Sequence, residues 1–324
     1  MNTRSLLLLC ALYLGFHTAP LAAQTSNRVP TIGILTLTAG PDEGIIKSFR
    51  AGLRQFGYIE GQSVRIELKS AGGQLEQLPK LAEELVRLNP DVIVTGGGPQ
   101  VRAVAQATNT IPIVVLFHEA DPTLTQLIKS YARPGGNVTG VDGREVEVVG
   151  KRVELLREVF PSVAQVAVLW NAYNRPELEE LKIAARSLGI RLRLIEVNAP
   201  YDFNSAFNDA RKMHVGAAII LLSPPFYVRR EQLHAASLRA KIPTIHQKEE
   251  MVRAGGLISY GVSFDDTWGR AAYFVDRILK GAKPSDLPVE QVSTFKLTVN
   301  LNTAKALGVT IPQSVLIRAD EVIH

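Results

Sequence analysis

Short apolar segments alternate with amphipathic segments along the chain from residue 31 onward. Segments 31–36, 91–95 and 111–117 are apolar at nearly every position, which is typical of strands buried on both faces of a parallel sheet. Segments 45–56 and 75–88 instead repeat apolar positions every three or four residues, as helices that cover a sheet do. The alternation predicts an α/β fold with a mostly parallel sheet.

The second half of the chain repeats this series. Landmarks of the first half, such as Ile32, Gly57 and Ile111, have counterparts at a nearly constant offset in Val166, Gly189 and Ile242. No linker rich in Ser, Pro or Gly separates the halves, which favours crossing strands over a loose tether. We therefore expect two similar doubly wound parallel-sheet lobes joined by hinge strands; two α/β domains that are alike by chance are the alternative.

The expected lobes are not continuous in sequence. Lobe 1 is expected to comprise residues 28–142 plus about 264–292, and lobe 2 residues 143–263 plus about 293–324.

Residues 1–23 have the layout of a secretory signal peptide. Arg4 precedes an apolar run over residues 5–16, and small residues follow up to Ala23. The run is shorter than the roughly 20 residues of a membrane-spanning helix, so cleavage after Ala23 is favoured over an uncleaved anchor. Cys10, the only cysteine, lies inside the run behind Leu9, unlike an acylated lipoprotein cysteine. We expect a periplasmic protein without disulfides.

Composition narrows the class of protein. The 324 residues are 46% hydrophobic and 21% charged, which are ordinary values for a globular chain of two domains. The net charge of +5 is spread without a dense basic run, so no nucleic-acid partner is expected.

The ligand site is expected between the lobes. Ligands of open α/β sheets bind beyond the carboxyl ends of the strands. The residues that follow these ends are Thr36, Thr95, Gly96, Gly97, Gly98, His118 and Asp121 in lobe 1, and Asn171, Ser223, His246 and Tyr260 in lobe 2.

Two of these features suit a charged ligand. The glycine turn 95–98 precedes Pro99 at an expected helix start, where free N–H groups favour a carboxylate. Asp121 is placed to hold a ligand ammonium group. The alternatives are a tight turn without a ligand and, for Asp121, a cap on the helix that begins near Pro122.

Searches for catalytic motifs find nothing. The chain contains no His-Glu-x-x-His motif, no phosphate-binding loop and no nucleophile elbow, so we expect no enzyme activity, no metal and no cofactor. His214 and His234 fall on predicted helices and are expected to be solvated.

Several segments together resemble one bacterial family. They are residues 56–61, 81–86, 91–95, 111–114, 132–140, 166–171, 255–261, 278–291 and 302–308. The chain resembles, over about residues 28–323, the ABC transporter substrate-binding proteins of the tryptophan/tyrosine-type group, which have a type I periplasmic-binding-protein fold. Characterised relatives bind aromatic amino acids.

The resemblance implies capture of a small solute outside the cytoplasm and its delivery to an ABC permease and its ATPase. Asp121 matches the aspartate of a family Gly-Asp-Pro motif, but Ala120 replaces the glycine. His118-Glu119 and Ser223-Pro224 also depart from the family pattern, so the ligand stays open.

Our leading hypothesis is a monomeric, non-catalytic binding protein for an amino acid or related carboxylate, which meets the membrane only through the permease. A ligand-sensing subunit of a membrane receptor is one alternative. A hydrolase or transferase that uses the same cleft is a second, less favoured one.

Overall fold

The computed structural model describes residues 28–40, 43–117, 126–143, 148–292 and 294–324. The expected signal peptide and the candidate site residues His118 and Asp121 lie outside the described residues.

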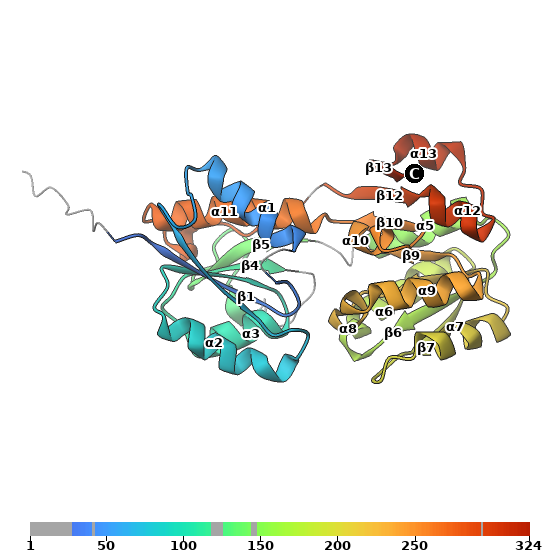
Figure 1. Ribbon diagram of the computed structural model, residues 1–324, viewed down its shortest axis with the longest axis horizontal. Coiled ribbons are helices and arrows are strands. Elements are labelled where there is room, and N and C mark those ends of the chain that lie inside the picture. Colours follow the sequence, from blue (N-terminus) through green and yellow to red (C-terminus); the bar gives the residue numbers. More distant parts are fainter. Residues whose placement is uncertain (1–27, 41–42, 118–125, 144–147, 293) are drawn as a thin grey trace, which may run out of the picture.

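The first lobe is a six-stranded sheet in the order β11-β5-β4-β3-β1-β2, with helices on both faces (Figure 1). All of its strand pairs are parallel. The strands are β1 (Thr31–Thr36), β2 (Arg65–Ser70), β3 (Val92–Gly96), β4 (Ile113–Phe117), β5 (Val138–Asp142) and β11 (Glu290–Gln291). The helices are α1 (Gly44–Gln55), α2 (Leu78–Arg87), α3 (Pro99–Ala107) and α11 (Phe264–Leu279).

Alternating side chains divide the core of this lobe into two layers. On β1, Ile32 and Ile34 pack in a cluster with residues of α1 and α11, whereas Leu35 packs in a second cluster with residues of α2 and α3. On β4, Val114 and Leu116 belong to the first cluster, and Ile113 and Val115 to the second. Because each face of the sheet packs against a layer of helices, β1 and β4 are apolar at nearly every position.

The second lobe is a seven-stranded sheet in the order β13-β12-β10-β9-β8-β6-β7. Its strands are β6 (Gln165–Trp170), β7 (Arg191–Glu196), β8 (Ala217–Ile220), β9 (Thr244–His246), β10 (Ile258–Gly261), β12 (Lys296–Asn300) and β13 (Glu321–Ile323). Its helices are α5 (Val149–Val159), α6 (Arg175–Ser187), α7 (Phe203–Lys212), α8 (Pro224–Val228), α9 (Arg230–Ala240), α10 (Glu249–Arg253), α12 (Leu301–Leu307) and α13 (Gln313–Arg318). Only the pairing of β12 with β10 is antiparallel among the described strand pairs of this sheet.

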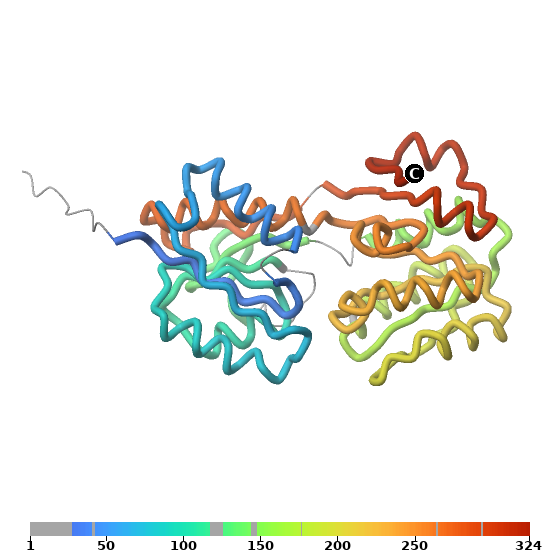
Figure 2. Tube along the Cα trace, viewed as in Figure 1, coloured from blue at the N-terminus to red at the C-terminus, as the bar shows by residue number. Residues whose placement is uncertain are grey.

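The chain passes between the lobes after β5, after β10 and after β11, as Figure 2 allows the reader to follow. The passage from β10 to α11 takes only Val262 and Ser263, and both are buried. Lys248 Nζ donates to Val262 O at 2.8 Å, and Ser263 Oγ donates to Glu249 Oε1 at 3.2 Å, which ties this connection to lobe 2. The predicted architecture of two α/β lobes with mostly parallel sheets is confirmed.

Candidate functional site: the edges that face each other across the lobes

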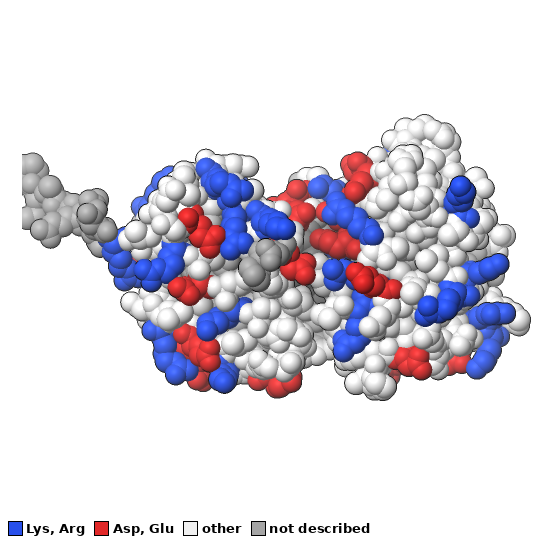
Figure 3. All heavy atoms as spheres, viewed as in Figure 1, with Lys and Arg blue, Asp and Glu red and all other residues white. Residues whose placement is uncertain are grey.

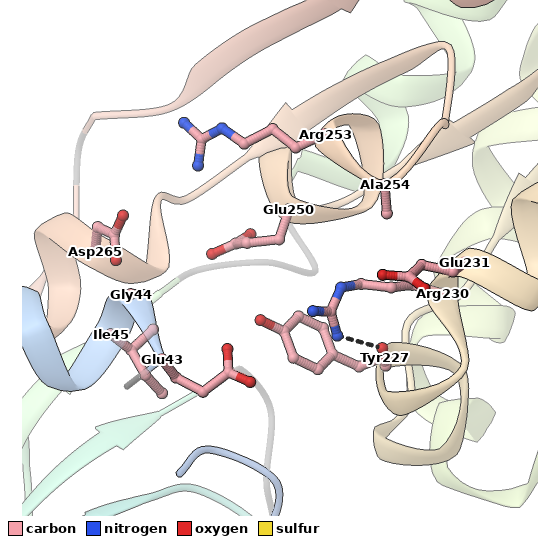
Figure 4. A pocket seen from close by; sticks show the side chains of 10 residues that line it. All are labelled: Glu43, Gly44, Ile45, Tyr227, Arg230, Glu231, Glu250, Arg253, Ala254 and Asp265. Atoms are coloured by element: carbon pink, nitrogen blue, oxygen red, sulfur yellow. Dashed lines mark hydrogen bonds between the residues drawn. The ribbon is translucent and has the colours of Figure 1, made fainter. Parts of the chain in front are cut away.

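The carboxyl ends of the strands meet at the junction of the two lobes. Helix α8, which follows β8, lies at the edge of lobe 2 that faces lobe 1 (Figure 1). A cleft of about 330 Å³ is lined by residues of both lobes, among them Gly44 at the start of α1 and Tyr227 on α8. Charged side chains gather over the same junction in Figure 3. Both lobes therefore contribute to one space at their junction (Figure 4), and none of the site residues predicted from the sequence that the structure describes lines it.

In lobe 1, Thr36 and Thr95 shape the loops at this edge. The Thr36 hydroxyl donates to Ala39 O at 2.6 Å, and the Thr95 hydroxyl donates to Leu35 O at 2.9 Å. Both side chains are buried. Their hydroxyl hydrogens are thus committed to backbone oxygens: Thr36 holds the loop after β1, and Thr95 ties the end of β3 to β1.

The glycine turn joins β3 to α3 as expected, with Pro99 in the first turn of the helix. Gly98 is the N-cap and has φ 62° and ψ −130°, a conformation that side chains with a Cβ rarely adopt. The N–H of Gly97 donates to Leu116 O at 2.9 Å, so the neighbouring strand engages it. Pro99 has no N–H and the N–H of Arg102 donates to Gly98 O, so the donors in the first turn of α3 are the N–H groups of Gln100 and Val101.

In lobe 2, Asn171 and Ser223 come together from the ends of two strands. Asn171 Nδ2 donates to Ser223 Oγ at 2.7 Å, and both residues are 2% exposed. Asn171 Oδ1 also accepts from the N–H of Tyr173, and Asn174 Oδ1 accepts from the N–H of Asn171. This reciprocal cap fixes the loop after β6.

A buried polar network continues from this pair toward the hinge. Asn174 Nδ2 donates to Leu222 O at 2.7 Å, and the N–H of Leu222 donates to Gln247 Oε1 at 2.8 Å. Gln247 Nε2 in turn donates to Glu177, which forms an ion pair of 3.0 Å with Arg152.

Arg152 closes the network at the last strand of this edge. It is 1% exposed, and its Nε donates to the backbone oxygen of Tyr260 at 2.8 Å. The network therefore links the carboxyl ends of β6, β8, β9 and β10. The paired charge and the additional hydrogen bonds are what allow a guanidinium to be buried.

His246 is not part of this network and is buried beside His234 of α9. Its ring meets that of His234 edge to face, with centroids 4.7 Å apart, and its Nε2 hydrogen-bonds with Thr244 Oγ1 at 2.8 Å. The expectation that His234 is solvated was wrong: it is 1% exposed on the inner face of α9. His214, which follows α7, is exposed as expected.

Two aromatic residues at the ends of lobe 2 strands, Trp170 and Tyr260, are partly buried against its core. Trp170 packs partly buried against this core, and Arg175 stands over its ring at 5.9 Å. Tyr260 also packs there, with its ring 6.1 Å from that of Phe295. Its contribution to the network is its backbone oxygen.

Sequence reasoning missed Arg152, Asn174 and Glu177. Asn174 could have been found, because an Asn three residues after Asn171 forms a capping pattern. Arg152 and Glu177 lie on helices where charged residues are usually solvated, and only the tertiary structure brings them together.

The profile of the family described as ABC transporter substrate binding protein matches residues 32–323. This chain belongs to that family. Proteins of the family bind a small-molecule substrate outside the cytoplasm and work with an ABC transporter. Within the described residues, no helix is both long enough and apolar enough to cross a bilayer.

Several known proteins are similar to this chain over most of their length. A tyrosine-binding protein from Clostridioides difficile is 26% identical over 289 residues, which are 87% of this chain and 82% of the relative. The structure of an ABC domain in complex with L-Trp from Streptococcus pneumonia is 28% identical, with a TM-score of 0.82 over 91% of this chain and 100% of that one. A conserved domain protein from Vibrio cholerae gives 29% identity and the same TM-score and coverage.

Proposed function

We propose that this chain is the extracytoplasmic solute-binding component of an ABC import system and that its ligand is an amino acid or a related carboxylate. The observation that carries the proposal is the family match through both lobes, together with relatives whose names tie them to tyrosine and to L-Trp. Aromatic amino acids are therefore the first candidates. The binding is non-catalytic and the protein acts as a monomer.

The described edges suit the carboxylate of such a ligand. Helix α3 begins behind Gly98, and the first N–H groups of a helix have no partner within it. Those groups and the helix dipole favour an anion at this point of the lobe 1 edge. Asp121 is the proposed partner of the ammonium group, and Asn171 with Ser223 is proposed to face the ligand from lobe 2.

The layout of residues 1–23 supports export to the periplasm. There the protein is proposed to deliver its ligand to the membrane-embedded permease, which works with the ATPase. N-terminal sequencing of periplasmic protein should begin near Gln24. Soluble cytoplasmic protein that retains Met1 would contradict export.

The binding function is tested by calorimetric titration of the mature chain. The panel comprises L-tryptophan, L-tyrosine, L-phenylalanine, 3-(indol-3-yl)propanoate, tryptamine and ribose. We expect one-to-one binding of an amino acid, weaker binding of the analogue that lacks the ammonium group, and none of ribose. A folded chain that binds no amino acid or carboxylate of a wide panel would contradict the proposal.

A further inference from the structure

Basic side chains gather at the end of lobe 2 that lies opposite its junction with lobe 1. The amino ends of β9, β8, β6 and β7 are neighbours at this end, because these strands are parallel. Helices α6, α7 and α9 end there as well, since each leads into the amino end of the next strand. In Figure 3 Lys and Arg side chains cluster over the part of lobe 2 where α7 and α9 end.

Four exposed side chains define what we call the distal basic face: Arg186, Arg191, Arg211 and Lys241. Arg186 and Arg211 lie in the last turns of α6 and α7, whereas Arg191 begins β7 and Lys241 follows α9. Neighbouring strands lie about 5 Å apart, so the four strand ends beside these residues span roughly 15 Å. The four charges therefore share one face of the molecule.

The acidic side chains near the ends of α5 and α7 do not offset these charges. Asp209 pairs with Lys212 at 2.8 Å, and Glu158 pairs with Arg318. Both carboxylates are thus engaged by basic residues outside the distal basic face. None of the four residues of this face forms an ion pair within the part of the chain that the structure describes.

The corresponding end of lobe 1 is built differently, although the two lobes share their architecture. Arg28, which precedes β1, pairs with Asp91 at 3.2 Å. Lys280, which follows α11, pairs with Asp276 at 2.6 Å. Acidic residues thus accompany basic ones at this edge of lobe 1, so an unbalanced positive edge is not a requirement of the fold.

Compensation of the helix dipoles explains only part of the distal basic face. Basic side chains in the last turn of a helix offset the partial negative charge of its carboxyl end, and Arg186 and Arg211 have this position. Arg191 and Lys241 lie outside the helices. Their charges add to the face without serving a helix end.

We propose that the distal basic face binds the surface of a bilayer that contains anionic phospholipids. Each Lys or Arg close to such a surface strengthens binding by about fivefold, and the effect requires no shaped pocket. Met213, which follows α7 and is 39% exposed, places an apolar side chain among these charges. Apolar surface beside basic groups favours a lipid interface over a purely polar polyanion.

This contact is separate from the ligand site. The carboxyl ends of the lobe 2 strands face lobe 1, and the distal basic face lies at their amino ends. A protein bound through this face keeps the junction of the lobes accessible. The sequence led us to expect contact with the membrane only through a permease, and the distal basic face adds a direct contact. The inference goes beyond the proposed function and does not depend on it.

The test is cosedimentation of the mature chain with vesicles at low salt. One set of vesicles is phosphatidylcholine alone, and the other contains one quarter phosphatidylglycerol. The test variant is the double substitution Arg186→Gln, Arg211→Gln. The matched control is Arg54→Gln, Arg277→Gln, which removes two exposed basic side chains from the last turns of α1 and α11 in lobe 1. Both double variants lose the same net charge and the same kind of helix-end residue.

We expect the wild type to bind the vesicles with phosphatidylglycerol and not the neutral ones. The partition coefficient should fall at least about tenfold in the test variant and less than about twofold in the control. Sodium chloride should release the protein, and inorganic phosphate at the same ionic strength should release no more.

Four results would overturn the inference. They are no binding to the anionic vesicles, equal binding to the neutral ones, an equal loss in the two double variants, and much stronger release by phosphate than by chloride. The third would assign binding to net charge, and the fourth would indicate a site for free anions. Circular dichroism establishes that the variants are folded, and Arg191→Gln, Lys241→Gln replaces a test variant that is not. Calorimetry with amino acids tests the proposed function separately.

Discussion

At the scale of single residues, the ion pair between Arg152 and Glu177 holds the edge of lobe 2 at which Asn171 and Ser223 lie. The side chains are 1% and 9% exposed, so each charge depends on the other for compensation. Removing one partner of a buried pair leaves an uncompensated charge, at a cost of about 3–5 kcal/mol. We expect the pair to support the proposed site without contacting the ligand.

We therefore expect Arg152→Met to lower the free energy of unfolding by about 3–5 kcal/mol. Lys151→Met is the matched control, because Lys151 is the preceding residue and pairs with Glu154 at the surface, with a side chain that is 62% exposed. That variant should change stability by less than about 1 kcal/mol. Urea unfolding measures the free energy of unfolding of both variants. An equal decrease in the two variants would show that the buried ion pair contributes no more to stability than the exposed one.

The buried histidine pair predicts a dependence of stability on pH. Burial, with a smaller effect of Arg230, lowers the pKa of His234 to about 3, and burial beside His234 lowers that of His246 well below its usual range. Because the unfolded chain binds protons more readily at both residues, stability is fully present above the unfolded pKa near 6.5 and falls as the pH drops from there toward 3.

Thermal unfolding between pH 8 and pH 4 checks this expectation. The double variant His234→Leu, His246→Gln should lose less stability across this range than the parent does. Equal slopes for the two proteins would assign the acid sensitivity to other groups.

Asp121 is the residue on which the amino-acid proposal depends most. Asp121→Asn keeps the shape of the side chain and removes its charge. The loss of a charge-assisted bond costs about 1.5–3 kcal/mol, which is roughly a ten- to hundredfold loss of affinity for the amino acid. Calorimetric titration measures this affinity. An Asp121→Asn protein that binds the amino acid as tightly as the parent would contradict the proposed contact between Asp121 and the ammonium group.

At the scale of elements, the packing of α1 against α11 depends on a glycine. A Cβ on Gly52 would lie 2.5 Å from Gly269 O and 2.9 Å from the Cβ of Ala272, so α1 can approach α11 this closely only without a side chain there. Helix α11 begins directly after Val262 and Ser263, which connect it to β10. The packing of α11 against α1 therefore also fixes the lobe 1 end of this connection.

We expect Gly52→Ala to destabilise the protein by about 1–3 kcal/mol, because the helices must move apart. Gly150→Ala is the control within another helix, since the nearest contact of its Cβ, with Ala184, is an ordinary 4.0 Å. It should be neutral or stabilise by up to about 1 kcal/mol through helix propensity. A Gly52→Ala protein as stable as the parent in urea unfolding would contradict the packing argument.

Local sequence patterns predicted the elements, whereas contacts between distant segments could not be predicted. The alternation of apolar strands and amphipathic helices is local, and it predicted the two-lobed α/β fold and the Pro99 start of α3. The antiparallel entry of β12, the Arg152–Glu177 pair and the burial of His234 depend on contacts between distant segments. No period or motif in the sequence marks such contacts, and the charged cleft at the junction was missed for the same reason.

At the scale of the whole molecule, the account requires two lobes that close on a shared ligand. The chain passes between the lobes after β5, β10 and β11, and the cleft is lined from both sides. A hinge of this kind permits rigid lobes to rotate while each core stays packed. The binding energy of the ligand is then available to favour the closed form.

Small-angle X-ray scattering of the mature chain, with and without the amino acid that calorimetry identifies, tests this requirement most directly. We expect a smaller radius of gyration at saturation, and in Asp121→Asn the same decrease only at ligand concentrations that are roughly ten- to hundredfold higher. An unchanged radius of gyration for the parent protein, at a ligand concentration shown by calorimetry to saturate it, would contradict closure of the lobes on the ligand.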